Sequence, residues 1–244
     1  MITTDLKFPY FRSKLCQFNL VLYFINGSKM PTKQKSTDDN ENVREKILDA
    51  ALEILYEEGF AGLSMRKIAL RAKMTAANLY NYYSNKDEIC LDIKTRGYSI
   101  LLKDFKQIEA QIEDPFTRMQ QLIRSYIAFG LNSVNQYDII FSQNTPKYSD
   151  YVGTPNEAAA MKERDAAISV LDIAGRTIVE MRKASGQEDL DDASYQALRI
   201  WTGLHGIVSL MNNRFLVEVD PEFDYTIEKL VNDLVDPFNP KSLS

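Results

Sequence analysis

The feature that most constrains this chain is a stretch without acidic side chains, SMRKIALRAKMTAANLYNYYSNK, which runs from Ser64 to Lys86. Its apolar residues recur at three- and four-residue spacings, which predicts two short helices around a tight turn. Ser64 and Thr75 stand where their side-chain oxygens can cap these helices. On the second helix Leu79 and Tyr83 share one face, so the small, amide and phenolic side chains point outward. The outward set is Ala76, Ala77, Asn78, Tyr80, Asn81 and Tyr82.

This outward face, with basic residues at its edges, is hard to explain as ordinary solvated surface, but it suits a DNA groove. Small residues let a backbone approach the major groove, amides pair with base edges, and tyrosine hydroxyls and lysines reach phosphate oxygens. The alternative is a helical hairpin in an all-helical enzyme or protein-interaction module that does not bind DNA.

The segment from Val43 to Leu91 resembles the DNA-binding domain of the TetR family of transcriptional regulators. Two residues depart from the family pattern: Lys73 stands where a glycine is usual at the turn, and Tyr83 replaces a phenylalanine. A non-glycine residue in a left-handed turn costs about 1 kcal/mol, which a packed domain can absorb. The matching positions are Gly59, Phe60, Ser64, Arg66, Ile68, Ala69, Leu79, Tyr80, Tyr82, Tyr83, Ser84, Lys86 and Ile89.

The resemblance also implies which residues contact the phosphates of DNA and which approach its bases. Thr75, Tyr80 and Lys86 are expected to hold phosphates. The residues expected to approach bases are Arg66, Ala76, Ala77 and Asn78, and Asn81 and Tyr82 complete the predicted DNA-binding face.

Charge supports this interpretation locally rather than on average. The whole chain carries a formal net charge of −5, which looks wrong for a nucleic-acid binder. A local patch, however, is what faces phosphate. The acid-free block holds the basic residues Arg66, Lys67, Arg71, Lys73 and Lys86.

The N-terminal segment departs from the pattern. Residues 15–25 are apolar but only about half as long as a membrane-spanning helix. They resemble a signal peptide superficially, without a clean cleavage site. We interpret Met30 as the natural start, with a genuine adaptable arm as the alternative, and expect a chain that begins there to fold and bind DNA. The predicted organisation is an extension over 1–40 that is disordered or upstream of the natural start, a helix-turn-helix domain over 41–88, and an effector-binding and dimerisation domain over 89–244.

The rest of the chain predicts an all-α fold, because helical periodicity recurs and no alternating strand pattern is present. The helix over 87–112 has the length of a rod that joins two domains. A loop is expected over 142–155, where Pro, Gly and Ser are dense. The other helices are expected over 42–58, 116–134, 156–184, 193–213 and 224–235.

The segment IWTGLHGIVSLMNNRF, residues 200–215, resembles the Trp-x-x-x-His-Gly signature of one group of TetR-family C-terminal domains. Trp201, His205 and Gly206 are the matching residues. The resemblance implies that the last two long helices form a four-helix interface with a second copy and that the middle helices enclose an effector cavity. Gly203 and Gly206 fit close helix packing, since each costs an exposed helix about 1 kcal/mol.

Bulky residues on helices that should face one another are the expected cavity lining, although each could equally be plain core. They are Phe105, Met119, Tyr126, Phe129, Phe141, Trp201 and His205.

No enzyme motif is present in the sequence. It lacks a phosphate-binding glycine loop, a nucleophile elbow and any His- or Cys-rich ligand spacing. His205 is the single histidine, and the two cysteines, Cys16 and Cys90, lie far apart, which is typical of a cytoplasmic protein without a disulfide framework.

The predicted function is a non-enzymatic, homodimeric repressor that a small-molecule effector releases from a palindromic double-stranded DNA operator. No metal, cofactor or membrane partner is expected.

Overall fold

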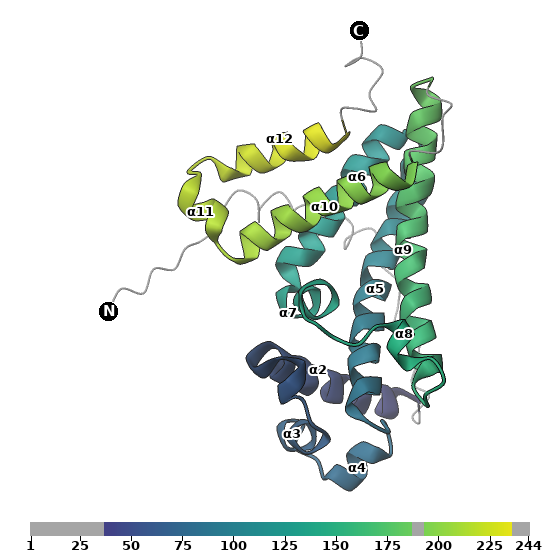
Figure 1. Cartoon of the computed structure of the whole chain (residues 1–244), viewed down its shortest axis with the longest axis vertical. Helices are drawn as coiled ribbons and strands as arrows, with labels where there is room; N and C mark the ends of the chain where they lie inside the picture. The colour runs from purple at the N-terminus through teal and green to yellow at the C-terminus, as the bar shows by residue number, and fades with distance from the viewer. Residues whose placement is uncertain (1–36, 187–192, 236–244) are drawn as a thin grey trace.

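The computed structural model describes residues 37–186 and 193–235, and every regular element in these ranges is helical. The predicted all-α fold is confirmed. The N-terminal segment up to residue 36 lies outside the described residues. A small group of helices, α2 to α4, sits at one end of a larger helical body, and α5 runs from one into the other (Figure 1).

The small end is built from α2 (Thr37–Gly62), α3 (Met65–Arg71) and α4 (Ala76–Tyr80). Helix α2 begins before the expected Asn42 and bends at Gly59, whose φ of 69° is left-handed and favours glycine. The predicted caps are present, since Ser64 accepts from the Lys67 amide and Thr75 from the Asn78 amide. The core of this end includes Ile47, Ala51, Ile54, Leu55, Ile68, Leu79 and Tyr83.

The larger body contains the long helices that the periodicity predicted. They are α5 (Lys86–Gln111), α6 (Pro115–Asn132), α9 (Glu157–Ala184), α10 (Ala193–Asn212) and α12 (Phe223–Val235). Short elements between these long helices are α7 (Val134–Tyr137), the π-helix η1 (Asp138–Ser142), α8 (Tyr148–Tyr151) and α11 (Phe215–Val219). None of the helices in the described ranges combines the length and apolar character needed to cross a membrane.

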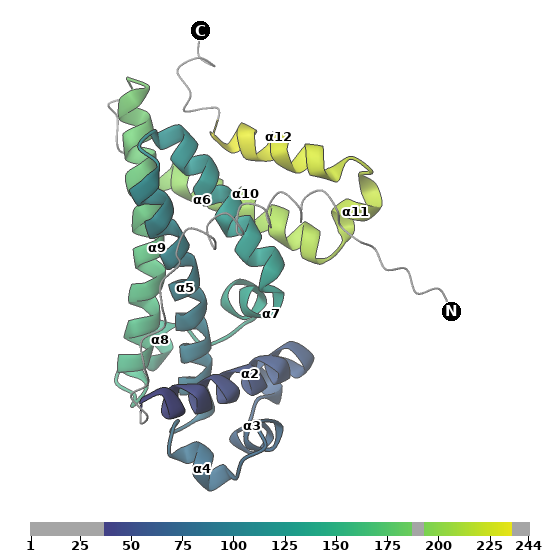
Figure 2. The same cartoon turned by 180° about the vertical axis from the view of Figure 1, so that it is seen from behind.

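Helices α5 and α9 lie side by side along most of their length in both views (Figures 1 and 2). At the end near α4, the Asn85 and Asn156 amides bond to each other reciprocally at 3.1 and 3.2 Å. In the middle, Lys94 Nζ lies 3.2 Å from Glu163 Oε1, and both side chains are almost fully buried.

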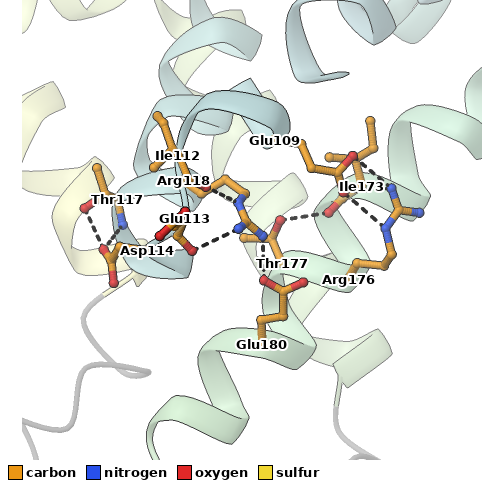
Figure 3. A network of polar contacts seen from close by, with 10 residues as sticks. All are labelled: Glu109, Ile112, Glu113, Asp114, Thr117, Arg118, Ile173, Arg176, Thr177 and Glu180. Carbon is orange, nitrogen blue, oxygen red and sulfur yellow. Dashed lines mark hydrogen bonds and ion pairs between the residues drawn. The ribbon is translucent and has the colours of Figure 1, made fainter. Parts of the chain in front are cut away.

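At the far end, arginines bind α9 to the α5–α6 turn (Figure 3). Arg118 donates to the carbonyls of Ile112 and Glu113 and to the Glu180 carboxylate, while Arg176 on α9 pairs with Glu109 on α5. Polar contacts therefore join the α5 region to α9 near both helix ends and in the middle.

The buried face of α9 does not follow hydrophobicity alone. Met161, Ile168 and Leu171 are 43 %, 39 % and 57 % exposed, whereas the polar Glu163 and Thr177 are buried. Glu163 is buried because Lys94 pairs with it across the helix contact, and the Thr177 hydroxyl donates to the Ile173 carbonyl within α9. Hydrophobicity alone therefore does not identify which face of this part of the helix is buried.

The buried pair predicts a specific stability pattern. Lys94→Met should lower the free energy of unfolding by about 3–5 kcal/mol, because it leaves Glu163 buried without its counter-charge. The double variant Lys94→Met/Glu163→Leu should recover most of this loss. Urea denaturation provides the measurement.

Arg176→Met is the matched control, because its ion pair with Glu109 joins the same two helices in solvent, where such pairs contribute about 0–1 kcal/mol. A Lys94→Met loss no larger than that of the control would contradict the buried-pair interpretation.

Candidate DNA-binding face and aromatic cluster

The second helix of the acid-free stretch, α4, presents the predicted polar face to solvent. Ala76, Ala77, Asn78, Tyr80 and Asn81 are exposed, whereas Leu79 is fully buried. The remaining member of the predicted face, Tyr82, is half-buried and packs against the core of the small end.

The turn between α3 and α4 adopts the conformation that the sequence comparison implied. Lys73 has a φ of 55°, so it takes up the left-handed conformation usually reserved for glycine. The Met74 amide closes the turn by donating to the Ala69 carbonyl at 2.9 Å. The turn therefore closes with a backbone hydrogen bond despite the lysine.

The basic patch divides into paired and unpaired side chains. Arg71 bonds to Glu53 and Glu57, and its hydrogen bond lowers the pKa of Glu57. Lys67 pairs with Glu58. Within the described ranges, Arg66 and Lys73 have no such carboxylate partner. The acidic partners come from α2, outside the acid-free stretch, so the local sequence overstated the cationic patch.

Lys86, a predicted phosphate ligand, lies against α2. Its Nζ sits 4.5 Å from the ring centroid of Phe60 and donates to the Phe60 carbonyl at 3.4 Å. Both contacts are weak, a cation–π contact at a half-buried site and a long hydrogen bond. Lys86 can therefore exchange them for a phosphate at small cost.

An aromatic cluster lies where α6, α7, η1 and α10 meet, with Tyr137 at its centre. The Tyr137 hydroxyl lies 2.7 Å from His205 Nδ1 and 3.3 Å from the Tyr126 hydroxyl. Phe129 and Phe141 have ring centroids 6.5 and 4.9 Å from that of Tyr137. Burial raises the pKa of both tyrosines, so the hydroxyls remain protonated donors.

Trp201 closes one side of this cluster. Its ring centroid lies 6.1 Å from those of both Phe141 and His205, and its side chain is 39 % exposed. Phe105 and Met119, the other predicted lining residues, are buried in the same apolar core, but no ring contact joins Phe105 to the cluster within the described residues. The structure therefore gathers five of the seven predicted residues.

Tyr137 is the residue that sequence reasoning left out. Nothing in the local sequence around Tyr137 marks this residue as the centre of the cluster. Its main partners, Tyr126 and His205, lie 11 and 68 residues away in sequence. Gly130 gives a further clue, because a Cβ there would lie 2.5 Å from Val208 and 3.2 Å from Tyr137.

Two family models match the chain. The one described as "Bacterial regulatory proteins, tetR family" matches residues 47–93, and the one described as "Tetracyclin repressor-like, C-terminal domain" matches residues 119–234. Together they cover more than half of the chain. The chain belongs to the TetR family. This TetR-family protein is a transcription regulator with a helix-turn-helix DNA-binding domain, in which α4 occupies the position of the recognition helix.

Curated relatives of this TetR-family regulator include both an activator and a repressor of transcription. The transcriptional activator FasR of Mycolicibacterium smegmatis is 26 % identical over 136 residues, 56 % of this chain and 56 % of FasR. The transcriptional repressor NicS of Pseudomonas putida is 27 % identical over 89 residues, 36 % of this chain and 40 % of NicS. The chain spans about half or less of the length of these relatives. Both are named as transcriptional regulators.

Solved structures share the fold of this regulator. A protein of unknown function from Rhodococcus sp. RHA1 has a TM-score of 0.61 at 21 % identity, covering 86 % of this chain and 97 % of its own. FadR from Bacillus subtilis, solved with stearoyl-CoA, has a TM-score of 0.61 at 15 % identity, covering 78 % and 97 %. Identities this low indicate the fold alone.

The contrast between paired and available lysines gives a testable prediction. Lys86→Ala should weaken binding to all duplexes about equally and lower the slope of log affinity against log salt by about one unit, because one phosphate contact is lost. Lys67→Ala is the control, since Lys67 already pairs with Glu58. Fluorescence anisotropy at several salt concentrations measures both slopes. Equal changes in the salt slopes of the two variants would contradict the prediction that Lys86, unlike Lys67, contacts a phosphate.

Proposed function

We propose that this regulator is a cytoplasmic homodimer that represses transcription from a palindromic operator until a small-molecule effector binds its C-terminal domain. The observation that carries the proposal is the exposed α4 face of small, amide and phenolic side chains beside the unpaired Arg66 and Lys73. In the assignment argued from the family motif, Asn78 reads bases while Thr75 and Tyr80 hold phosphates.

Helices α10 and α12 are the proposed dimer interface. They pack together, and α10 also contacts α9 and α6 (Figures 1 and 2). On α10, Tyr195, Leu198 and Thr202 are exposed at helical spacing, and a Cβ at Gly206 would meet nothing within 4 Å. Gly203, by contrast, already packs against Leu234 of the same chain. An open glycine on an apolar helix face suits the close approach of a second helix.

Dimerisation would give the recognition helices the two-fold symmetry that a palindrome requires. Two such helices enter successive major grooves when they lie about 34–36 Å apart. Helix α5 starts beside the recognition helix and runs into the body, so a tilt of α5 changes this separation. An effector that favours the more widely separated dimer would weaken DNA binding, and DNA would weaken effector binding by the same factor.

The aromatic cluster is the proposed effector site, in agreement with the Trp-His-Gly group that the residues from Trp201 to Gly206 resemble. It combines apolar rings with polar Tyr126, Tyr137 and His205 atoms, the mixture typical of small-molecule sites. The segment that carries Tyr137 also contacts the DNA-binding end. Ile139 on η1 is buried in that end's core, and Gln143 donates to the Leu55 carbonyl of α2 at 3.1 Å. A ligand against Tyr137 is therefore one short helix away from α2.

The dimer proposal is tested by two leucines of equal exposure. Leu198→Glu on α10 should produce a monomer with strongly reduced operator affinity, because it buries a charge in the proposed interface. Leu171→Glu on α9 is the control, since Leu171 is 57 % exposed and Leu198 56 %. Light scattering coupled to size-exclusion chromatography measures the mass. A monomeric Leu171→Glu variant beside a dimeric Leu198→Glu variant would move the interface to α9.

The effector proposal is tested with the single tryptophan of the chain as reporter. A library that includes stearoyl-CoA, the ligand of FadR, is screened for compounds that raise the melting temperature; a ligand at a hundred times its Kd adds about 2.7 kcal/mol. A ligand in the cluster should change Trp201 emission and weaken binding to a duplex that the protein selects from random sequences.

Phe129→Leu should alter this response and leave ligand-free DNA affinity nearly unchanged. Phe105→Leu is the comparison, because Phe105 lies in the same core outside the ring contacts. Losses of stability in both variants without any change in effector response would assign Phe129 to the core alone.

A further inference from the structure

The recognition helix cannot hold its own orientation. Helix α4 has five residues, Ala76–Tyr80, far fewer than a helix needs to be stable in isolation. The segment between it and α5 is turn and bend, so the chain itself does not make α4 rigid with α5. The angle of α4 therefore depends on the side chains that anchor it, Leu79 in the core and those beyond its C-terminal end.

At its C-terminal end, three elements meet around one buried ring. Tyr83 is 2 % exposed, and its hydroxyl donates to Asp92 Oδ2 on α5 at 2.5 Å. The Arg44 guanidinium of α2 lies 4.7 Å from the Tyr83 ring centroid and donates to the Tyr82 carbonyl at 3.1 Å. Arg44 Nη1 also lies 3.8 Å from Asp92 Oδ2. We call Arg44, Tyr83 and Asp92 the α4 clamp.

Packing alone does not require the Tyr83 hydroxyl. The family motif usually has phenylalanine at this position, and an aromatic ring already fills the core pocket next to Leu79. A buried hydroxyl without a partner would cost about 1–3 kcal/mol, so a tyrosine is tolerated here because Asp92 accepts a hydrogen bond from its hydroxyl. Burial, reinforced by the Asp92 carboxylate, raises the pKa of Tyr83, which keeps the hydroxyl a donor.

A hydrogen bond to a carboxylate is directional and about twice as strong as a neutral one. It joins Tyr83, which follows α4, to the second turn of α5, while Arg44 joins the neighbouring Tyr82 carbonyl to α2. The ring's burial also excludes Tyr83 from any contact with DNA. Whatever the hydroxyl does for DNA binding, it must do through the position of α4.

We propose that Tyr83 is a positioning residue for operator recognition. Its hydrogen bond to Asp92, together with the Arg44 guanidinium that packs over its ring, sets the angle of α4 relative to α5. Discrimination between operator and random DNA then depends on a hydroxyl that never touches the duplex. The inference rests on the helix-turn-helix domain and is independent of the proposed dimer interface and effector site.

The test uses a duplex that the wild-type protein selects from a random pool and a scrambled duplex of the same composition. Tyr83→Phe should lower the ratio of the two affinities by about three- to tenfold, because α4 samples a wider range of angles. Affinity for the scrambled duplex and the salt slope should stay unchanged, since no phosphate contact is removed.

Two controls separate positioning from folding. Ile54→Val removes a methyl group from the core of the small end, where Ile54 is 1 % exposed, and should lower stability without changing the affinity ratio. Asp92→Asn keeps an acceptor for Tyr83 and should lower the affinity ratio less than Asp92→Ala does.

In the Asp92→Ala background, Tyr83→Phe should cause no further change in the affinity ratio. If Asp92→Ala does not fold, Asp92→Asn is compared with Tyr83→Phe instead, and Asp92→Asn should lower the ratio less.

An unchanged ratio in folded Tyr83→Phe would overturn the inference. A parallel loss of affinity for both duplexes, matched by Ile54→Val at equal stability, would also overturn it and leave the hydroxyl a purely structural role. Failure of the wild-type protein to select any duplex would instead count against DNA binding by the domain itself.

Discussion

The contact between α5 and α9 is the constraint on which the rest of the structure depends. Helix α5 belongs to both cores, with Ile89 and Ile93 at the DNA-binding end and Leu101 and Phe105 in the body. The buried Lys94–Glu163 pair sits between these two sections and tolerates little sliding, because a displaced charge would remain in an apolar contact without its partner. Movement of α5 is therefore expected to carry α9 with it and to occur against α6 and α10.

The segment 134–142 is the second link between the two ends. Its side chains alternate between the cores: Tyr137 and Ile140 pack in the body, while Ile139 is fully buried in the DNA-binding end. A π-helix suits this division, because its wider turn redirects successive side chains, and such turns are frequent at functional sites. The α4 clamp completes the connection by holding the recognition helix to α5.

Local sequence predicted most of the fold but only part of the site. The long helices follow from three- and four-residue periodicity, and the exposed face of α4 follows from the positions of Leu79 and Tyr83. The state of the basic residues did not follow, because Arg71 meets Glu53 and Glu57, which stand 18 and 14 residues earlier. The buried face of α9 did not follow either: hydropathy ranks Met161 and Leu171 above Glu163, whereas the charge on Lys94 makes burial of Glu163 possible.

The sequence by itself determined where the chain is helical, where it turns and which short helix exposes small and amide side chains. These properties depend on neighbours within one or two helical turns, and capping, periodicity and glycine conformation report them directly. Tertiary structure alone decided which cations remain unpaired, that Tyr137 is the hub of the aromatic cluster and that the Tyr83 hydroxyl reaches Asp92. Such contacts depend on the packing of separate elements, and the pattern within each element carries no information about which side chains another element will bring to it.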